Sequence, residues 1–265
     1  RFVWDGLNTQ RLDRPHVRRD GKLSAASWGD AFGLIAEKIN GKADKLAAIA
    51  GDLVCAEGQF ALKSLMDTLG SPNLDCRQDG AKLSGPRANY LFNSSIAGIE
   101  DADALLIIGS NPRLEAPVLN ARIRKRWTMG NFPVAVIGEP ADLTYDAETI
   151  GAGANTLNDM VAGKHAFADV LKNAARPMIV LGQGALSGAD GASVLAAAIV
   201  LAEASGAVSD DWDGFNVLHT AAARVAGLDL GLLPGEGGRD VAAILDGAQS
   251  GEIETVVLYG ADEIA

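Results

Sequence analysis

The sequence has few cysteines, no long apolar run and a minority of basic residues. Cys55 and Cys76 are its two cysteines, so a disulfide framework is excluded and a reducing compartment is the default. No apolar run approaches the roughly 20 residues that a membrane-spanning helix needs, so direct membrane insertion is not expected. The net charge of −11 argues against a nucleic-acid partner and against docking on anionic lipid.

The remaining composition is that of an ordinary globular protein. Hydrophobic residues make up 48% and charged residues 22% of the 265 residues, which is enough for one large domain or two modest ones. The chain begins at Arg1 without a methionine or a secretory segment, and it stops soon after the strand-like residues 256–259. We therefore expect this sequence to be a piece of a larger protein.

One stretch in the middle of the sequence predicts a β-α-β unit. The apolar run 104–108 ends at a glycine and is typical of a strand buried on both faces. Turn residues follow, and Pro117 suits the first turn of a helix, so residues 109–116 are expected to form a loop. The helix 117–127 carries one apolar stripe, and residues 133–138 form a second buried strand. A parallel sheet with a crossover helix is therefore expected.

Other apolar patterns extend the prediction to an α/β fold. An Asp-Gly turn predicts a small hairpin over residues 16–23. Further strands are expected at 46–50, 177–182 and 255–259. Helices are expected at 27–39, 57–69, 156–162, 165–174, 189–204, 217–226 and 239–247. Two long segments, 77–98 and 206–238, show no clear long element apart from the helix expected at 217–226, and they are interpreted as loops.

The turn after strand 177–182 partly matches a dinucleotide-binding fingerprint. Its sequence is Gly182-Gln183-Gly184-Ala185-Leu186-Ser187, and Glu203 lies at the spacing of a ribose-binding acid. However, Ser187 stands where the third glycine belongs. An ordinary tight turn between a strand and a helix is therefore the favoured interpretation, and nucleotide binding is the alternative.

A second candidate site follows strand 104–108. The turn Gly109-Ser110-Asn111-Pro112 lies at the carboxyl end of a strand, where open α/β sheets bind ligands. The Asn111 amide can donate and accept hydrogen bonds, so it suits either a ligand or the turn itself. The two cysteines are interpreted as small buried side chains, and His16, His165 and His219 as structural or surface residues. No catalytic triad, Walker loop or zinc signature is present.

Several segments resemble the molybdopterin oxidoreductases. Residues 11–39, with Asp20-Gly21-Lys22-Leu23, resemble the entry to the core of that superfamily, and residues 104–117 resemble its Gly-x-Asn-Pro loop. A closer resemblance, to the large iron–sulfur subunits of respiratory complex I, is carried by residues 73–77, 111–117, 213–219, 227–231 and 260–263.

This resemblance implies two interleaved Rossmann-like αβα domains with mostly parallel sheets. Residues 1–44 would connect to preceding domains and contain the hairpin and a helix. Residues 45–92 and 170–265 would share one sheet of an outer domain, truncated at its end. Residues 93–169 would form the inserted α/β domain.

The resemblance also implies a molybdopterin site that has lost its metal. Superfamily enzymes place a metal ligand shortly after the segment that resembles residues 73–76, and the matching positions here are Asp79, Gly80 and Ala81. Ala81 cannot ligate a metal, and Asp79 is a weak candidate. We therefore expect no catalytic residue, no metal and no cofactor in this chain, with iron–sulfur clusters only in a part N-terminal to Arg1. The vestigial cofactor-binding candidates are Gly109, Ser110, Asn111, Pro112, Glu139 and Gly182.

The function implied is that of a non-catalytic scaffold within proton-pumping NADH:quinone oxidoreductase. Its partners would be other hydrophilic-arm subunits of complex I, and at least one of the segments 77–98 and 206–238 would contact such a subunit. Its location would be peripheral, on the cytoplasmic face of the bacterial inner membrane or the matrix side in mitochondria. The alternatives are an active molybdopterin-dependent oxidoreductase and, from composition alone, a nucleotide-dependent α/β enzyme.

Overall fold

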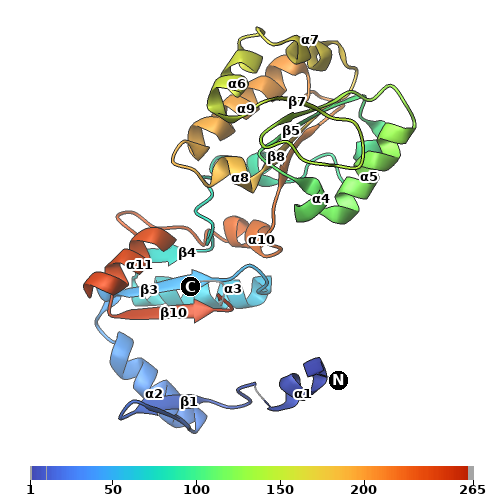
Figure 1. The fold of residues 1–265 in the computed structure, drawn as a ribbon. Coiled ribbons are helices and arrows are strands. Elements are labelled where there is room, and N and C mark those ends of the chain that lie inside the picture. Colours follow the sequence, from blue (N-terminus) through green and yellow to red (C-terminus); the bar gives the residue numbers. More distant parts are fainter. Residues whose placement is uncertain (1, 10, 262–265) are drawn as a thin grey trace.

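The computed structural model describes residues 2–9 and 11–261, which form an N-terminal arm and two α/β parts (Figure 1). The N-terminal arm consists of the described residues up to Ile39. It contains helix α1 (Phe2–Thr9), strands β1 (His16–Arg19) and β2 (Lys22–Ala25), and helix α2 (Trp28–Ile39). In Figure 1 the arm lies at the end of the molecule away from the upper α/β part.

Local sequence signals determine the structure of the arm. Asp20 and Gly21 have φ angles of 49° and 76°, so both residues of the two-residue turn are left-handed, as a tight hairpin requires. Ser27 caps helix α2, because its Oγ accepts a hydrogen bond from the Asp30 backbone N–H at 3.1 Å. The predicted hairpin and the predicted start of this helix are therefore confirmed.

The smaller α/β part is built on three parallel strands in the order β10-β3-β4. They are β3 (Leu46–Ala50), β4 (Asn73–Asp75) and β10 (Thr255–Tyr259). Alternate residues of β3 face opposite sides: Ala48 packs with α3 (Ala56–Leu69), and Ile49 packs with α11 (Val241–Ser250). The three-residue strand β4 was not predicted, since so short a run carries no clear period.

The larger part is built on five parallel strands in the order β7-β6-β5-β8-β9. The strands are β5 (Ala104–Ile108), β6 (Val134–Ile137), β7 (Glu148–Gly151), β8 (Pro177–Gly182) and β9 (Phe215–Leu218). Leu105 and Ile107 pack on the side of α5 (Pro117–Thr128). Leu106 and Ile108 pack on the side of α6 (Gly153–Val161), α7 (Ala166–Asn173) and α9 (Gly191–Ser205). The predicted buried strand at the centre of the sheet is confirmed.

Short elements complete the fold. Helix α4 (Pro112–Glu115) lies inside the segment that was expected to be a loop, and helix α8 (Gln183–Leu186) follows β8 directly. Helix α10 (Arg224–Asp229) lies between the two sheets in Figure 1. The described residues also form three 3-10 helices: Ala43–Lys45, Arg87–Tyr90 and Ala97–Asp101.

The strand pairing corrects the predicted division of the chain. Residues 170–265 were expected to complete the sheet begun by residues 45–92, but β8 and β9 belong to the larger sheet. Strand β8 pairs with β5 along its length, from Ala104 opposite Pro177 to Ile108 opposite Leu181. Only β10 returns to the smaller sheet. The two sheets are nevertheless interleaved, because β3 and β4 precede all five strands of the larger sheet and β10 follows them.

The segments predicted as loops are largely packed. The helix expected at 217–226 is wrong, because strand β9 ends at Leu218 and helix α10 begins at Arg224. Segment 77–98 lies against segment 206–238: the Val217 N–H donates to the Leu91 carbonyl at 2.8 Å, and Arg87 pairs with Asp229 at 2.9 Å. Contact of either segment with another subunit stays a prediction.

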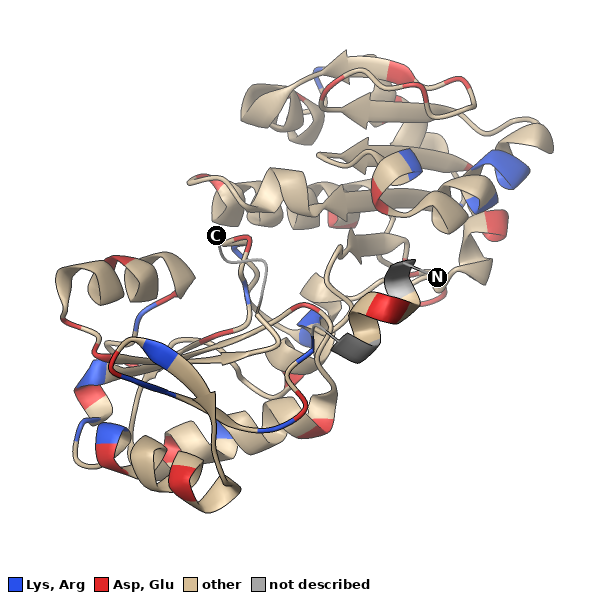
Figure 2. Ribbon diagram, turned by 60° about the horizontal axis from the view of Figure 1, so that its bottom comes forward, with Lys and Arg blue, Asp and Glu red and all other residues tan. Residues whose placement is uncertain are grey.

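Charged residues are spread over the whole molecule. Acidic and basic positions are scattered along helices and loops of both α/β parts (Figure 2). Among the described residues, no helix combines the length and the apolar character needed to cross a membrane.

Candidate functional site

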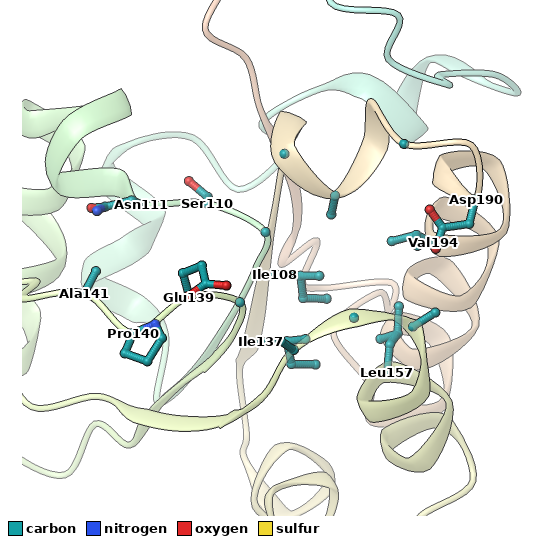
Figure 3. A pocket seen from close by; sticks show the side chains of 18 of the residues that line it. Ile108, Ser110, Asn111, Ile137, Glu139, Pro140, Ala141, Leu157, Asp190 and Val194 are labelled. Atoms are coloured by element: carbon teal, nitrogen blue, oxygen red, sulfur yellow. The ribbon is translucent and has the colours of Figure 1, made fainter.

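A pocket of about 480 Å³ opens at the carboxyl ends of strands β5, β6 and β7. Its apolar floor combines the last residues of two strands, Ile108 and Ile137, with Leu157 from α6 and Val194 from α9 (Figure 3). Parallel strands direct their carboxyl ends to one edge, and ligand sites of α/β proteins form at this edge. The candidates Gly109, Ser110, Asn111 and Glu139 all line this pocket.

The polar rim of the pocket is mainly acidic. Glu139 follows β6 and Asp190 precedes α9, and their side chains lie on opposite sides of the pocket (Figure 3). Glu115 from α4 is the third lining carboxylate. The sequence did not predict that Glu115 and Asp190 line the pocket. Each lies there because of how the helix that contains it or follows it, α4 or α9, packs in the folded protein.

Glu115 holds the loop after β5 in place. One of its carboxylate oxygens accepts a hydrogen bond from Ser110 Oγ at 2.7 Å, and the other accepts from the Asn111 backbone N–H at 2.7 Å. Pro112 occupies the first turn of α4 and is buried beside the pocket without lining it. The Asn111 Oδ1 atom is buried and has no hydrogen-bond partner in the part of the chain that the structure describes.

Glycines bring two loops together beneath the pocket. Gly109 has a φ of 60°, and a Cβ there would lie 2.4 Å from Ala185 Cβ. A Cβ at Gly182 would lie 2.5 Å from Ser110 Cβ. Gly182 therefore allows the loop after β8 to pack closely against the loop after β5, and it does not line the pocket.

The position of Glu203 argues against a dinucleotide fingerprint after β8. Glu203 is exposed and lies twelve residues after Gly191, the first residue of α9. At about 1.5 Å per residue this places it about 18 Å along the helix from the pocket edge. A ribose bound at the Gly182 turn would not reach that carboxylate, so the tight-turn interpretation accounts for these residues.

The charge of the pocket favours neutral or cationic ligands. Among the described residues that line it are three carboxylates and no Lys, Arg or His. Helix α6 begins at Gly153 on the pocket wall, and a helix N-terminus contributes only about half a positive charge. The acidic side chains therefore outweigh the helix, and a phosphate group would be repelled.

Asp79, the residue at the expected metal position, forms an ion pair. Its Oδ1 lies 3.0 Å from Nη2 of Arg224 and accepts a hydrogen bond from the Ala81 N–H at 3.1 Å. Asp52, which follows β3, lies 3.9 Å from the same nitrogen. Gln78 donates to Asp52 through Nε2 at 3.1 Å. Within the described ranges, no group of three or more His, Cys, Asp and Glu side chains is arranged to hold a metal ion.

The three histidines are held by local structure. His219 Nε2 lies 2.6 Å from the Tyr90 carbonyl and Nδ1 lies 3.2 Å from Gln183 Nε2, so these partners favour a neutral ring with its proton on Nε2. Burial lowers the pKa of His219. His165 caps α7 by accepting from the Phe167 N–H, and His16 lies beside the Arg14 carbonyl. These local contacts fit the interpretation of all three as structural or surface residues, which stays a prediction.

The two cysteines differ in environment. Cys76 is buried, and burial raises the pKa of its thiol to about 12, so the thiol stays protonated. Cys55 is exposed, which corrects the prediction that both side chains are buried. Its Sγ lies 3.7 Å from the Tyr259 hydroxyl.

The α/β fold with mostly parallel sheets agrees with a comparison to known families. The sequence profile of the molybdopterin oxidoreductases matches residues 11–265, so the chain belongs to the molybdopterin oxidoreductase family. It is 40% identical to an NADH-quinone oxidoreductase subunit of Rickettsia bellii and 42% identical to the subunit of the same name in Rickettsia felis, in both cases over 100% of this chain. It is also 42% identical, over 88% of the chain, to the mitochondrial NADH dehydrogenase [ubiquinone] iron-sulfur protein 1 of Solanum tuberosum.

These relatives are much longer than this chain. The aligned region covers 37% and 38% of the two Rickettsia proteins and 32% of the Solanum protein. The predicted resemblance to the large iron–sulfur subunits is confirmed.

Proposed function

We propose that this chain is a scaffold region of the large iron–sulfur subunit of an NADH:quinone oxidoreductase, with a molybdopterin site that no longer binds its cofactor. Similarity over the whole chain to two Rickettsia proteins named as parts of that assembly supports the assignment. One structural observation carries the scaffold role: the apolar face of helix α2 is uncovered. Electron transfer would then depend on clusters held elsewhere in the same polypeptide.

Helix α2 has an apolar side but no buried residue in the structure. Trp28, Phe32 and Ile35 are 65%, 59% and 48% exposed, and the first two rings lie 5.5 Å apart between centroids. A helix of this length gains most of its stability from packing an apolar face against other structure. Large exposed aromatic side chains that form one patch mark a protein interface.

The occupant that we propose for this face is the cluster-bearing part of the same longer polypeptide. More than three-fifths of each Rickettsia relative lies outside the aligned region, which leaves enough polypeptide to cover the face. A strongly apolar contact resembles a permanent interface rather than a transient one. A segment of the same polypeptide is always present, so it prevents the exposed aromatic residues from driving aggregation.

The charges at the two candidate sites support a degenerate cofactor site. The lining of the pocket carries Glu115, Glu139 and Asp190, which oppose a phosphate-bearing pterin cofactor. Asp79 is engaged by a guanidinium group rather than available to a metal. The protein would be peripheral, on the cytoplasmic face of a bacterial inner membrane or on the matrix side in mitochondria.

Photo-cross-linking in the assembled oxidoreductase tests this function. A benzophenone amino acid replaces Phe32 in the full-length protein, and the matched control replaces Phe60, an exposed residue of α3. We expect position 32 to cross-link within its own polypeptide, at a cluster-bearing segment, in much higher yield than position 60. A cross-link to a different polypeptide, or no cross-link, would contradict the proposed contact.

Elemental analysis of the same purified complex tests the degenerate site. We expect iron but no molybdenum in proportion to this protein, and no pterin fluorescence after acid release. Stoichiometric molybdenum would support the alternative of an active molybdopterin-dependent oxidoreductase instead.

A further inference from the structure

Two of the three carboxylates that line the pocket at the carboxyl ends of β5, β6 and β7 have no protein partner. Glu115 accepts hydrogen bonds from Ser110 Oγ and from the Asn111 N–H, so its carboxylate is used within the loop after β5. The carboxylates of Glu139 and Asp190 form no hydrogen bond and no ion pair with any residue that the structure describes. Two negative charges at the rim are therefore available to a ligand.

The two available carboxylates lie on opposite sides of the apolar floor of the pocket (Figure 3). Glu139 belongs to the loop after β6 and Asp190 directly precedes α9, so different loops bring them to the same edge of the sheet. Both are exposed, and a ligand can reach them from solvent. The floor between them consists of the aliphatic side chains of Ile108, Ile137, Leu157 and Val194.

The size and lining of the pocket define the kind of ligand. A volume of about 480 Å³ lies within the roughly 300–1,000 Å³ that is typical of small-molecule sites. An anion is disfavoured, because none of the described lining residues is Lys, Arg or His. A metal ion is disfavoured as well, because an aliphatic floor supplies no oxygen ligands between the two carboxylates. The complementary molecule is positively charged at both ends and apolar in the middle.

We propose that this pocket binds a small aliphatic diamine, with one ammonium group at Glu139, the other at Asp190 and the methylene chain on the apolar floor. Alkyl amines are protonated at neutral pH, as the lysine side chain is. Contact with the floor removes apolar surface from water, and the two carboxylates select a ligand with two charges over a ligand with one. The inference deepens the proposed loss of the cofactor and rests on it, because a pterin cofactor would compete for the same pocket.

Titration calorimetry of the full-length protein with cadaverine tests the inference. The matched probe is n-pentylamine, which has the same carbon chain and a single charge. We expect one cadaverine site per protein, with a dissociation constant about fivefold lower than that of n-pentylamine, because the second ammonium group gains an ion pair. This preference should decrease with added salt, which screens charges at an exposed rim. Pentanediol, which is uncharged at both ends, should not bind measurably.

Single substitutions separate the two ends of the site. Glu139→Gln and Asp190→Asn should each abolish the preference for cadaverine over n-pentylamine. Both side chains are exposed, and asparagine is as good a residue as aspartate before a helix, so both variants should keep the wild-type thermal midpoint. The control is Glu203→Gln, which removes an exposed carboxylate of α9 outside the pocket and should leave binding unchanged.

Three results would overturn the proposal: no cadaverine binding, equal affinity for the two amines in the wild type, or a preference that survives both substitutions together. Cadaverine binding that is lost in the assembled oxidoreductase would also overturn it, and would assign the pocket to a basic side chain of another subunit. Stoichiometric molybdenum in the wild-type complex would contradict the proposed function. A molybdenum-free complex without selectivity for the diamine would contradict this inference alone.

Discussion

His219 lies between Gln183 and the Tyr90 carbonyl, and its charge state depends on burial. Both ring nitrogens have a protein partner, and neither partner is a carboxylate. Burial is the largest cause of its lowered pKa, and the positive charge of Arg224 also lowers it, whereas the hydrogen bond to Tyr90 and the charge of Asp79 raise it. The folded protein therefore holds this ring neutral at pH values where an unfolded chain begins to protonate it.

The lowered pKa predicts a pH dependence of stability. As pH falls through 6.5, the unfolded chain takes up a proton at His219 before the folded protein does. The free energy of unfolding should fall with it, by at most about 1.4 kcal/mol per pH unit. His219→Gln should remove most of this dependence in urea titrations at pH 7.5 and 5.5.

The matched control for this measurement is His16→Gln. His16 lies in the exposed hairpin of the arm, so this variant removes a histidine without touching the buried ring of His219. If His219→Gln retained the full wild-type dependence between the two pH values, the stated role of burial at this residue would be wrong.

At the scale of single elements, β5 is the centre of the larger sheet. It pairs with β6 on one side and β8 on the other, and all five of its residues are buried. Its odd-numbered residues pack toward α5 and its even-numbered residues pack toward α6, α7 and α9. A change within this strand therefore affects the packing of both layers of helices.

Ile107→Ala should lower the free energy of unfolding by about 2–5 kcal/mol, through lost transfer energy and the cavity that remains. Ile107 is 0% exposed and packs with Leu119 and Ile123 of α5. Val118→Ala, on the exposed side of the same helix, should change stability by less than about 0.5 kcal/mol. A denaturant midpoint shift worth less than about 1 kcal/mol for Ile107→Ala would show that β5 is not central.

At the scale of the whole molecule, the arm and the two sheets differ in how much they bury. Helix α2 buries no residue, whereas each sheet is packed by helices on both faces. Regions with few buried apolar contacts open locally at low free-energy cost, and strands in a core open only with global unfolding.

Hydrogen exchange should therefore separate the arm from the sheets. In this 265-residue protein alone, amides of α2 should exchange much faster than those of β5. In the assembled oxidoreductase the α2 amides should become protected, because the proposed function covers this face. Equal protection of α2 and β5 in the isolated protein would contradict the uncovered face that supports the proposal.

Most individual helices and strands could be predicted from local patterns in the sequence. Strands 104–108 and 177–182 and the start of α5 at Pro117 follow from apolar runs, turn residues and proline, which act over a few neighbouring residues. The turn Gly109-Ser110-Asn111 was placed at a ligand edge because open α/β sheets bind ligands at the carboxyl ends of their strands, whereas Glu139, which also lines the pocket, was named from the family resemblance.

How these helices and strands combine depends on contacts that form only in the folded molecule. Strand β8 could pair in either sheet by its pattern, and its position depends on hydrogen bonds with β5, more than 70 residues earlier in the chain. Asp79 and Arg224 are 145 residues apart, so nothing in the local sequence links their charges. Strand pairing and charge compensation join residues that are far apart in the sequence, so these contacts form only once the chain has folded.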